Sequence, residues 1–481
     1  MLACPRRRMQ VIAPKDRLTY PEPRRTGMAR GTTSPGNADI VRASPFVVRT
    51  DVLSWGRTTR EPQRVAAPRF RDELPDLIGD PSCASKLAIG MRRSYGDSCL
   101  NGAGALIDMG GLDRFIRFEP ETGVLCAEAG VGLSDILRFV VPKGWFLPTT
   151  PGTRFVTLGG ALANDVHGKN HHVCGSFGRH VRRFGLLRSD RGRQTVTAES
   201  DPALFSSTVG GLGLTGIIEW VEIQLVRIGS AYLEVETVPY ARLDDFWPLT
   251  EASAAFEHTV AWIDCTSRGE KRGRGIFSRA NWIADGVYAV HDDRSWKRVP
   301  FETPGLALNG LTVGAFNNAY YYLGGASAGK SRQHYASFFY PLDAVHGWNR
   351  LYGRNGMLQY QCVIPRDNQR DGIAALLDVI TASGQGSFLA VLKTFGELTS
   401  PGLLSFPRPG ATLALDFPFR GEATLKLMAQ LDAIVAEAGG ALYPAKDGRM
   451  PAEMFRRSFP QWERLMKDPE MSSDFWRRVA Q

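Results

Sequence analysis

Three glycine-rich segments between residues 90 and 216 constrain the fold of this 481-residue chain more than any other feature. They are residues 90–97 (GMRRSYGD), 152–160 (GTRFVTLGG) and 210–216 (GGLGLTG), and each adjoins a short run of apolar residues. Glycine allows backbone N–H groups to approach a phosphate closely, and Ser94, Thr153 and Thr157 add hydroxyl donors. Neither GxxxxGK(S/T) nor a GxGxxG between a strand and a helix occurs. The loops therefore predict a phosphorylated ligand without naming it.

Two kinds of secondary-structure pattern follow each other, so the sequence predicts an α+β protein of two domains. Up to about residue 230, short strands (86–89, 105–108, 123–128 and 218–226) alternate with helices (72–78 and 133–141), and we expect these strands to share one sheet. From residue 231 onward, longer strands (232–238, 259–263, 358–364, 387–393 and 412–417) are joined to helices (371–382 and 423–438). Residues 281–335 show little periodicity, which predicts either long mobile loops that act as a lid over a site or an apolar contact surface.

The basic residues gather at the start of the chain. The net charge is +9, but residues 1–50 hold ten Lys or Arg and three Asp or Glu, which leaves +2 for the other 431 residues. This segment lacks apolar periodicity, so we expect a disordered basic extension, which either is inert or is attracted to an anionic surface. The nearly neutral remainder argues against nucleic-acid binding. No run of about 18 apolar residues predicts a membrane-spanning helix.

Neither the cysteines nor the histidines predict a metal site. The seven cysteines are scattered without a CxxC pair, which indicates neither a zinc module nor a disulfide framework and suits a reducing cytoplasm. His167, His171 and His172 lie in the segment DVHGKNHH, where Gly168 and Asn170 disfavour a helix that would align two of the rings. Two interpretations remain: a hydrogen-bonded histidine loop, or a histidine in a cofactor site that moves a proton.

Six segments together resemble one family. RRSYGD, PGTRFVTLGGALANDVHGKNHHVCGSFGRHV, TVGGLGLTGII, LQYQCVIP, LSFPRPGATLALDFP and LYPAKDGR are similar, in order and spacing, to the decaprenylphosphoryl-β-D-ribose 2-oxidase family, a branch of the vanillyl-alcohol-oxidase type FAD-linked oxidases. The resemblance covers residues 51–480. It implies a two-subdomain FAD-binding domain of the PCMH type (residues 51–230), an inserted α+β substrate domain (231–440) and a C-terminal segment (441–481) that completes the FAD domain.

The resemblance also implies roles for individual residues. Lys446 and His167 would be catalytic. The residues implied at the cofactor are Gly90, Arg93, Ser94, Tyr95, Gly96, Met109, Gly152, Thr153, Thr157, Gly159, Gly160, Ala163, Asn164, His167, Gly168, Gly216, Ile218 and Tyr443. Those implied at the substrate are Gln359, Gln361, Lys393, Asp416, Trp262 and Tyr340. Arg93 stands where relatives with covalent flavin have a histidine, so we expect FAD to be bound non-covalently.

The sequence departs from the family pattern at three positions. Arg92 replaces a glycine of the first loop, and Asn164 stands where mycobacterial members have a cysteine. Ala414 occupies the place of the pocket cysteine that nitroaromatic inhibitors attack. These changes bear on the geometry of the phosphate loop and on the specificity for the lipid.

Three functions follow as hypotheses. The first is oxidation of the 2-hydroxyl of a polyprenylphosphoryl-β-D-ribose to the 2-keto sugar, after which an NAD(P)H-dependent short-chain reductase completes epimerisation to the arabinose form used for arabinan. Such an enzyme would be cytoplasmic, in peripheral contact with the inner face of the membrane. The second is oxidation of a soluble alditol or of D-arabinono-1,4-lactone with oxygen as acceptor. The third is a non-enzymatic binding protein with degenerate cofactor loops.

Overall fold

The computed structural model describes residues 44–293, 297–304 and 308–480. Residues 1–43 of the predicted disordered extension therefore lie outside the described residues. The prediction is wrong for the end of that segment, because β1 (Val47–Arg49) pairs antiparallel with β2 (Gln63–Ala66). Phe46, immediately before β1, is buried in the hydrophobic core beside this sheet. Ordered structure thus begins before residue 51.

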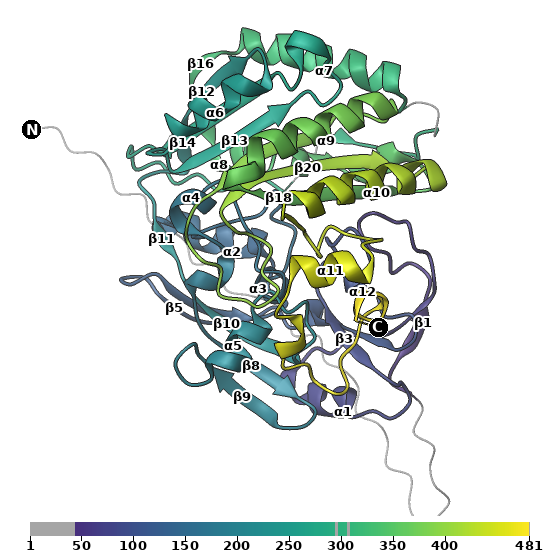
Figure 1. Cartoon of the computed structure of the whole chain (residues 1–481). Coiled ribbons are helices and arrows are strands. Elements are labelled where there is room, and N and C mark those ends of the chain that lie inside the picture. Colours follow the sequence, from purple (N-terminus) through teal and green to yellow (C-terminus); the bar gives the residue numbers. More distant parts are fainter. Residues whose placement is uncertain (1–43, 294–296, 305–307, 481) are drawn as a thin grey trace, which may run out of the picture. The chain divides into compact units, whose positions relative to one another are not determined.

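Two small sheets make up the first part of the fold (Figure 1). The four-stranded sheet has the order β1, β2, β4 (Ala105–Asp108), β3 (Lys86–Ile89), with β2, β4 and β3 parallel. The five-stranded antiparallel sheet has the order β5 (Phe115–Glu119), β6 (Val124–Glu128), β10 (Ile217–Gln224), β8 (Val181–Arg188), β9 (Gly192–Val196). The expectation of one shared sheet is wrong, because β10 pairs with β6 and β8 and not with β3.

Short helices fill the space around these sheets. They are α1 (Leu74–Ile78), α2 (Leu133–Val140), α3 (Leu158–Ala163), α4 (His171–Cys174) and α5 (Pro202–Thr208). In α3 the apolar side chains of Leu158, Ala161 and Leu162 are buried in one core with Val221 of β10. Thr157 caps the start of α3 by accepting a hydrogen bond from the N–H of Gly160. This packing fixes the glycine-rich segment that leads into the helix.

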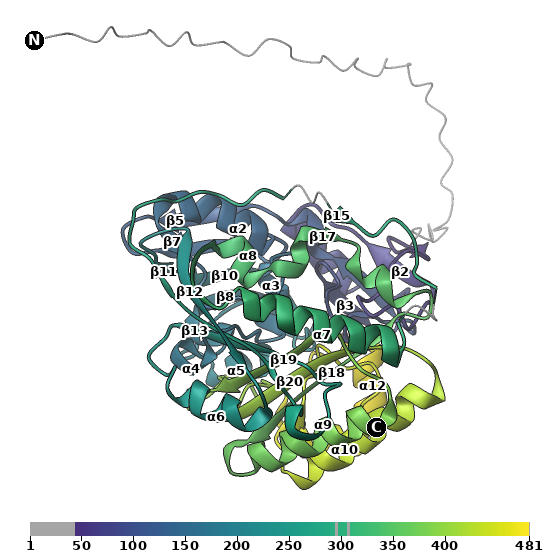
Figure 2. The same ribbon diagram turned by 90° about the horizontal axis from the view of Figure 1, so that it is seen from above.

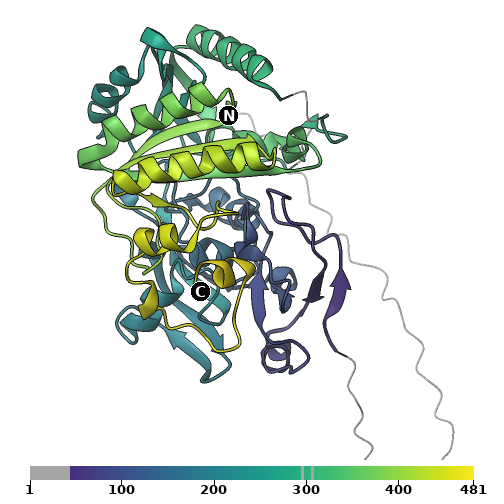
Figure 3. The same ribbon diagram turned by 45° about the vertical axis from the view of Figure 1, so that its right-hand side comes forward.

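An antiparallel eight-stranded sheet forms the second part of the fold. Its order is β16 (Gly329–His334), β12 (Tyr232–Tyr240), β14 (Gly275–Trp282), β13 (His258–Ile263), β19 (Ala390–Phe395), β20 (Gly410–Pro418), β18 (Met357–Pro365), β21 (Ala441–Leu442). The helices α6 (Leu243–Glu251), α9 (Gln369–Ser383) and α10 (Glu422–Glu437) share one core with this sheet. Figures 2 and 3 show α9 and α10 side by side along one face of the sheet.

The opposite face of the large sheet carries α7 (Gly310–Ala326), which contacts β12 and β14 (Figure 2). The prediction of lid loops over residues 281–335 is therefore wrong for much of that range, since α7 and β16 lie within it. Asn309 caps α7 by accepting hydrogen bonds from the N–H groups of Leu311 and Thr312. β16 is held by regular pairing with β12. Tertiary contacts order a segment that local periodicity does not.

The C-terminal segment contacts both parts of the fold. β21 lies at the edge of the large sheet, and α11 (Ala452–Ser458) and α12 (Asp474–Val479) contribute Phe455 and Phe475 to its core. Asp474 also accepts a hydrogen bond of 3.0 Å from the N–H of Gly102, and Met471 bridges to Lys86 at β3. Residues after 441 therefore hold the first glycine-rich region against the large sheet.

The remaining short elements are β7 (Trp145–Phe146) paired with β11 (Val226–Arg227), β15 (Lys297–Arg298) paired with β17 (Val345–His346), and α8 (Tyr335–Phe339). Among the described residues, no helix is both long and apolar enough to cross a membrane.

Candidate functional site

A cavity of about 1340 Å³ is lined by the glycine-rich loops and by one face of the large sheet. The predicted site residues that line it are Gly90, Arg93, Ser94, Tyr95, Gly152, Thr153, Thr157, Gly160, Ala163, Asn164, His167, Gly168, Trp262, Gln359, Gln361, Lys393, Asp416, Tyr443 and Lys446. These residues are distant in the sequence, and the fold brings them to one space. A volume of this order is large enough for a nucleotide cofactor and part of a second ligand.

The two glycine-rich loops supply free backbone donors to this cavity. Within the described residues, the N–H groups of Arg92, Arg93, Ser94, Gly152 and Thr153 have no hydrogen-bond acceptor. A hydroxyl also lacks a partner, since the buried Oγ of Ser98 makes no hydrogen bond there. Unpaired donors beside a cavity are the chemistry that a pyrophosphate requires. The residues present therefore fit the phosphate part of FAD.

Two of the loop glycines serve packing more than ligand approach. A Cβ at Gly90 would overlap the side chain of Thr157, and one at Gly96 would overlap the carbonyl oxygen of Asp447. Gly152, in contrast, has no atom within 4 Å of that position and faces open space. Gly90 and Gly96 thus let the first loop close on its neighbours, and Gly152 lies where a ligand can approach.

Arg92 adopts the backbone conformation that suits the glycine it replaces. Its φ is +50°, in the left-handed region, which costs a residue with a side chain about 1 kcal/mol. Its guanidinium lies 3.4 Å from the carboxylate of Asp108. Arg92 thus holds a backbone conformation that a glycine adopts more easily, and its side chain adds an ion pair beside the loop.

Six of the predicted residues do not line the cavity. Gly96 packs against the backbone of residues 447–448, and Gly159 against Ala129. Met109 and Ile218 are buried in hydrophobic cores, and Gly216, with φ +138°, packs against the carbonyl of Leu187. Tyr340 is buried behind the wall, where its hydroxyl bonds to Thr150 Oγ1 at 2.7 Å. For these six residues contact with a ligand stays a prediction, and the three glycines could make such a contact only through their backbone atoms.

His167 is at the centre of a buried polar cluster. Gln361 Nε2 lies 3.0 Å from His167 Nε2, and Lys393 Nζ lies 3.4 Å from His167 Nδ1. Burial and the nearby charge of Lys393 hold the pKa of His167 well below 6.5, so the ring is neutral. Burial lowers the pKa of Lys393 to about 8. The interpretation of a histidine in a cofactor site fits this geometry better than that of a loop histidine.

The neutral ring allows two proton arrangements. If the Gln361 amide donates to Nε2, the N–H of the ring is on Nδ1, and Lys393 must be a neutral amine to accept from it. If the Gln361 oxygen faces the ring, Nε2 carries the hydrogen and Nδ1 accepts from a charged Lys393. Both arrangements link a lysine of low pKa to a ring that can pass a proton.

Lys446 lies in the same wall, near Tyr95 and Asp416. Its Nζ is 4.2 Å from the centre of the Tyr95 ring. Burial lowers the pKa of Lys446 to about 8, and the carboxylate of Asp416 opposes that shift. Burial also raises the pKa of Asp416 to about 7, although Gln359 Nε2 donates to this carboxylate at 2.5 Å. Each of the two groups can therefore gain or lose a proton near neutral pH, as acid–base catalysis requires.

Aromatic residues that sequence reasoning missed line another part of the cavity. They are Trp55, Phe316, Tyr320, Trp348 and Phe388. Phe316 and Tyr320 are spaced i and i+4 in α7, and this spacing is the one signal that could have indicated a shared helix face. Lys169 also lines the cavity, and it lies inside the predicted histidine segment.

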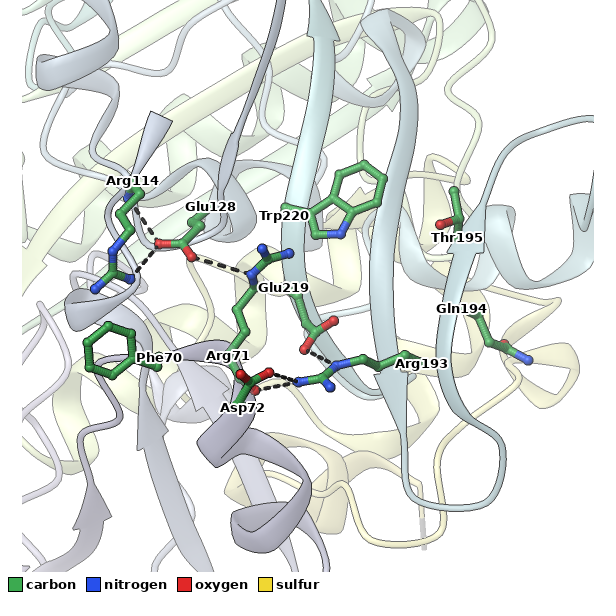
Figure 4. Close-up of a pocket in the computed structure, with 10 residues that line it drawn as sticks. All are labelled: Phe70, Arg71, Asp72, Arg114, Glu128, Arg193, Gln194, Thr195, Glu219 and Trp220. Carbon is green, nitrogen blue, oxygen red and sulfur yellow. Dashed lines mark hydrogen bonds and ion pairs between the residues drawn. The ribbon is translucent and has the colours of Figure 1, made fainter. Parts of the chain in front are cut away.

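A second pocket, of about 530 Å³, lies apart from this cavity (Figure 4). Arg193 pairs with the buried Glu219 at 2.9 Å, and Arg114 pairs with the buried Glu128 at 3.2 Å. Each carboxylate of this pocket is paired with an arginine of the same pocket. Within the described residues, no three His, Cys, Asp or Glu side chains gather as metal ligands would.

Comparison with known proteins extends these observations. Residues 62–198 match the family described as FAD binding domain. The decaprenylphosphoryl-beta-D-ribose oxidase of Mycolicibacterium smegmatis is 35% identical over 455 residues, which are 89% of this chain and 97% of that protein. An uncharacterized protein of Streptomyces coelicolor is 30% identical over 73% of this chain and 100% of its own length. The D-arabinono-1,4-lactone oxidase of Saccharomyces cerevisiae is 21% identical over 51% of each chain.

Proposed function

The chain belongs to the decaprenylphosphoryl-β-D-ribose oxidase family, and we propose that it uses FAD to oxidise the 2-hydroxyl of a polyprenylphosphoryl-β-D-ribose to the 2-keto sugar. The observation that carries this proposal is the buried cluster of Lys446, Asp416, His167 and Lys393 in one cavity with the free N–H groups of the phosphate-binding loops. Bound FAD would supply the hydride acceptor, which no protein side chain provides.

The side chains of the cluster would stabilise charge, accept the hydroxyl proton and orient the sugar. Removal of the hydroxyl proton puts developing negative charge on the oxygen, which favours departure of the hydride from carbon, and a buried ammonium such as Lys446 would stabilise that charge. The hydroxyl proton needs an acceptor. Asp416, whose pKa burial raises to about 7, can take it when ionised, and Lys393, whose pKa burial lowers to about 8, can take it as a neutral amine beside the neutral ring of His167. Trp262 and Gln361 on the sheet face would orient the sugar.

Product analysis tests this function. Incubation with a prenylphosphoryl ribose is expected to give a product two hydrogens lighter, which borodeuteride reduces with deuterium at C2 alone. Deuterium at another carbon would favour the second candidate, a soluble alditol or D-arabinono-1,4-lactone oxidase. The same conclusion would follow if the prenylphosphoryl ribose stays unchanged while a parallel incubation oxidises the lactone.

FAD is expected to be released by acid precipitation, because the first loop offers no histidine to form a covalent link. Arg93 stands at that place, and its guanidinium lies 4.3 Å from the centre of the Trp55 ring. The measurement is the absorbance of the supernatant and of the pellet after denaturation of the yellow protein. Flavin that stays with the washed pellet would show a covalent bond and contradict this expectation.

Two partners follow from the proposed reaction. The 2-keto product needs a reductant at C2, so we propose that an NAD(P)H-dependent short-chain reductase consumes it. We also propose a cytoplasmic enzyme in peripheral contact with the inner face of the membrane. The supporting observation is that α7 has no charged residue and exposes Leu311 and Tyr322, of which 86% and 58% are accessible.

A further inference from the structure

The face of the large sheet that lines the cavity changes its polarity from one side to the other. Antiparallel pairing places five residues in one row across five strands: Gln361, Ala414, Val391, Trp262 and Ile276. All five line the cavity. The row begins at the Gln361 amide, which contacts His167, and becomes apolar toward Ile276.

The neighbouring rows follow the same gradient. Lys393, Asp416 and Gln359 lie on β19, β20 and β18, at the end of the cavity near the phosphate-binding loops. Val260 of β13 is the next residue in the row of Lys393, and Val235 lies two strands farther, on β12. Within the described part of this wall, no charged side chain stands on β13, β14 or β12. The sheet therefore presents a charged half and an uncharged, largely apolar half to one continuous space.

Helix α7 covers the apolar half. Its side chains Phe316 and Tyr320 line the cavity, and the Tyr320 ring lies 4.7 Å from that of Trp262. The rings of Phe316 and Tyr320 stack at 5.9 Å, and Phe316 also contacts Phe388 at 5.6 Å. At Gly324 the helix lies directly on Ile276 of β14, where a Cβ would overlap that side chain. The space between helix and sheet is therefore a mainly apolar arm, in which Thr237 and Ser278 contribute the polar groups of the sheet wall.

We propose that this apolar arm, bounded by α7 and by strands β12, β14 and β13, holds the first isoprene units of the lipid chain of the substrate. The inference rests on the proposed function, which supplies a substrate with a polar head and a prenyl chain. A sugar placed at Lys446 and His167 lies beside this arm, whose uncharged wall suits an apolar chain better than the part of the cavity lined by charged residues such as Glu302 and Arg350. A soluble alditol or lactone would leave the arm without an apolar occupant, and leaving such a surface in contact with water is unfavourable.

Calorimetric titration of the FAD-loaded enzyme with prenyl monophosphates of one, two and three isoprene units tests the arm without any turnover. Each added unit is expected to tighten binding by at least about 10-fold until the arm is full, because every buried CH₂ group adds to the affinity. Equal dissociation constants for the three compounds would overturn the proposal.

Substitutions in the wall of the arm test where the isoprene chain binds. Ser278 faces the arm between Thr237 and Val260, so Ser278→Trp is expected to remove the gain contributed by the second and third units. Val260→Phe is a second, milder obstruction for the case in which Ser278→Trp does not fold. Leu323→Trp adds the same bulk on the outer face of α7, where 71% of Leu323 is exposed, and should keep the full dependence on chain length. A dependence that survives both obstructions would overturn the proposal.

A parallel titration with prenylphosphoryl riboses separates the two proposals. If no compound of any length reduces the flavin, the proposed function fails. If all lengths reduce it with the same apparent dissociation constant, the function stands and the assignment of the arm fails. Reduction with a chain-length dependence that Ser278→Trp abolishes supports both.

Discussion

Lys446→Ala is expected to keep its fold and its FAD but to lose reduction of the flavin by substrate by about 100-fold or more. The ammonium of Lys446 lies in a buried wall with Tyr95 and Asp416, where a preorganised charge acts with little screening by water. Removal of one such group from a catalytic site commonly reduces the rate by this factor or more. The measurement is the anaerobic rate of flavin bleaching at saturating substrate, normalised to flavin content.

Two variants control this prediction. Lys446→Met keeps most of the side-chain volume and removes only the charge, so it should lose as much as Lys446→Ala. Lys330→Ala removes a lysine that is 65% exposed and outside the cavity, and it should bleach at the normal rate. Near-normal bleaching by Lys446→Met would exclude the charge of Lys446 from the mechanism and would direct attention to His167.

The rate of flavin reduction is expected to follow a bell-shaped pH profile with its maximum between about pH 7 and pH 8, and Asp416→Asn is expected to shift it. Lys446, whose pKa is lowered to about 8, acts as a cation, so the rate falls as the pH rises through that value. Asp416, whose pKa is raised to about 7, supports that cation only when ionised, so the rate also falls as the pH drops below 7.

In Asp416→Asn the carboxylate that raises the pKa of Lys446 is lost. The pKa of Lys446 should therefore fall, the alkaline limb should move to lower pH, and the rate at pH 8 should decrease by about 10-fold or more. Part of the rate should return on acidification, which a merely structural defect would not produce. Asp378→Asn, on the exposed end of an ion pair with Arg272, serves as the control. An unchanged profile in Asp416→Asn would contradict the coupling of these two groups.

Much of the secondary structure follows from local pattern. The apolar alternation of residues 232–238 and 412–417 predicts strands, and both lie within strands of the structure, β12 and β20. Helix α7 could not be predicted in this way, because its glycines, asparagines and tyrosines give no helical period and have low helix propensity. Contacts with β12 and β14 stabilise it instead. The polar segment of β16 likewise forms a strand only because it pairs with β12.

The candidate site was accessible to sequence reasoning only where its residues are close in the chain or match a motif. Thr157, Gly160 and His167 lie in one such segment, and all three line the cavity. Gly159 and Gly216 show a limit of this reasoning, because a glycine that packs against a neighbour looks the same in sequence as one that approaches a ligand. The row from Gln361 to Ile276 depends on the order of five strands that are distant in the chain. That order is set by tertiary packing and leaves no local signal.

Anaerobic mixing of the purified protein with two substrates tests the central claim most directly. One is a short-chain prenylphosphoryl ribose, the other D-arabinono-1,4-lactone, and the absorbance of the bound flavin is followed in each case. The account predicts that the prenylphosphoryl ribose bleaches the flavin completely within one turnover and that the lactone leaves it oxidised. Bleaching by the lactone alone would contradict the account.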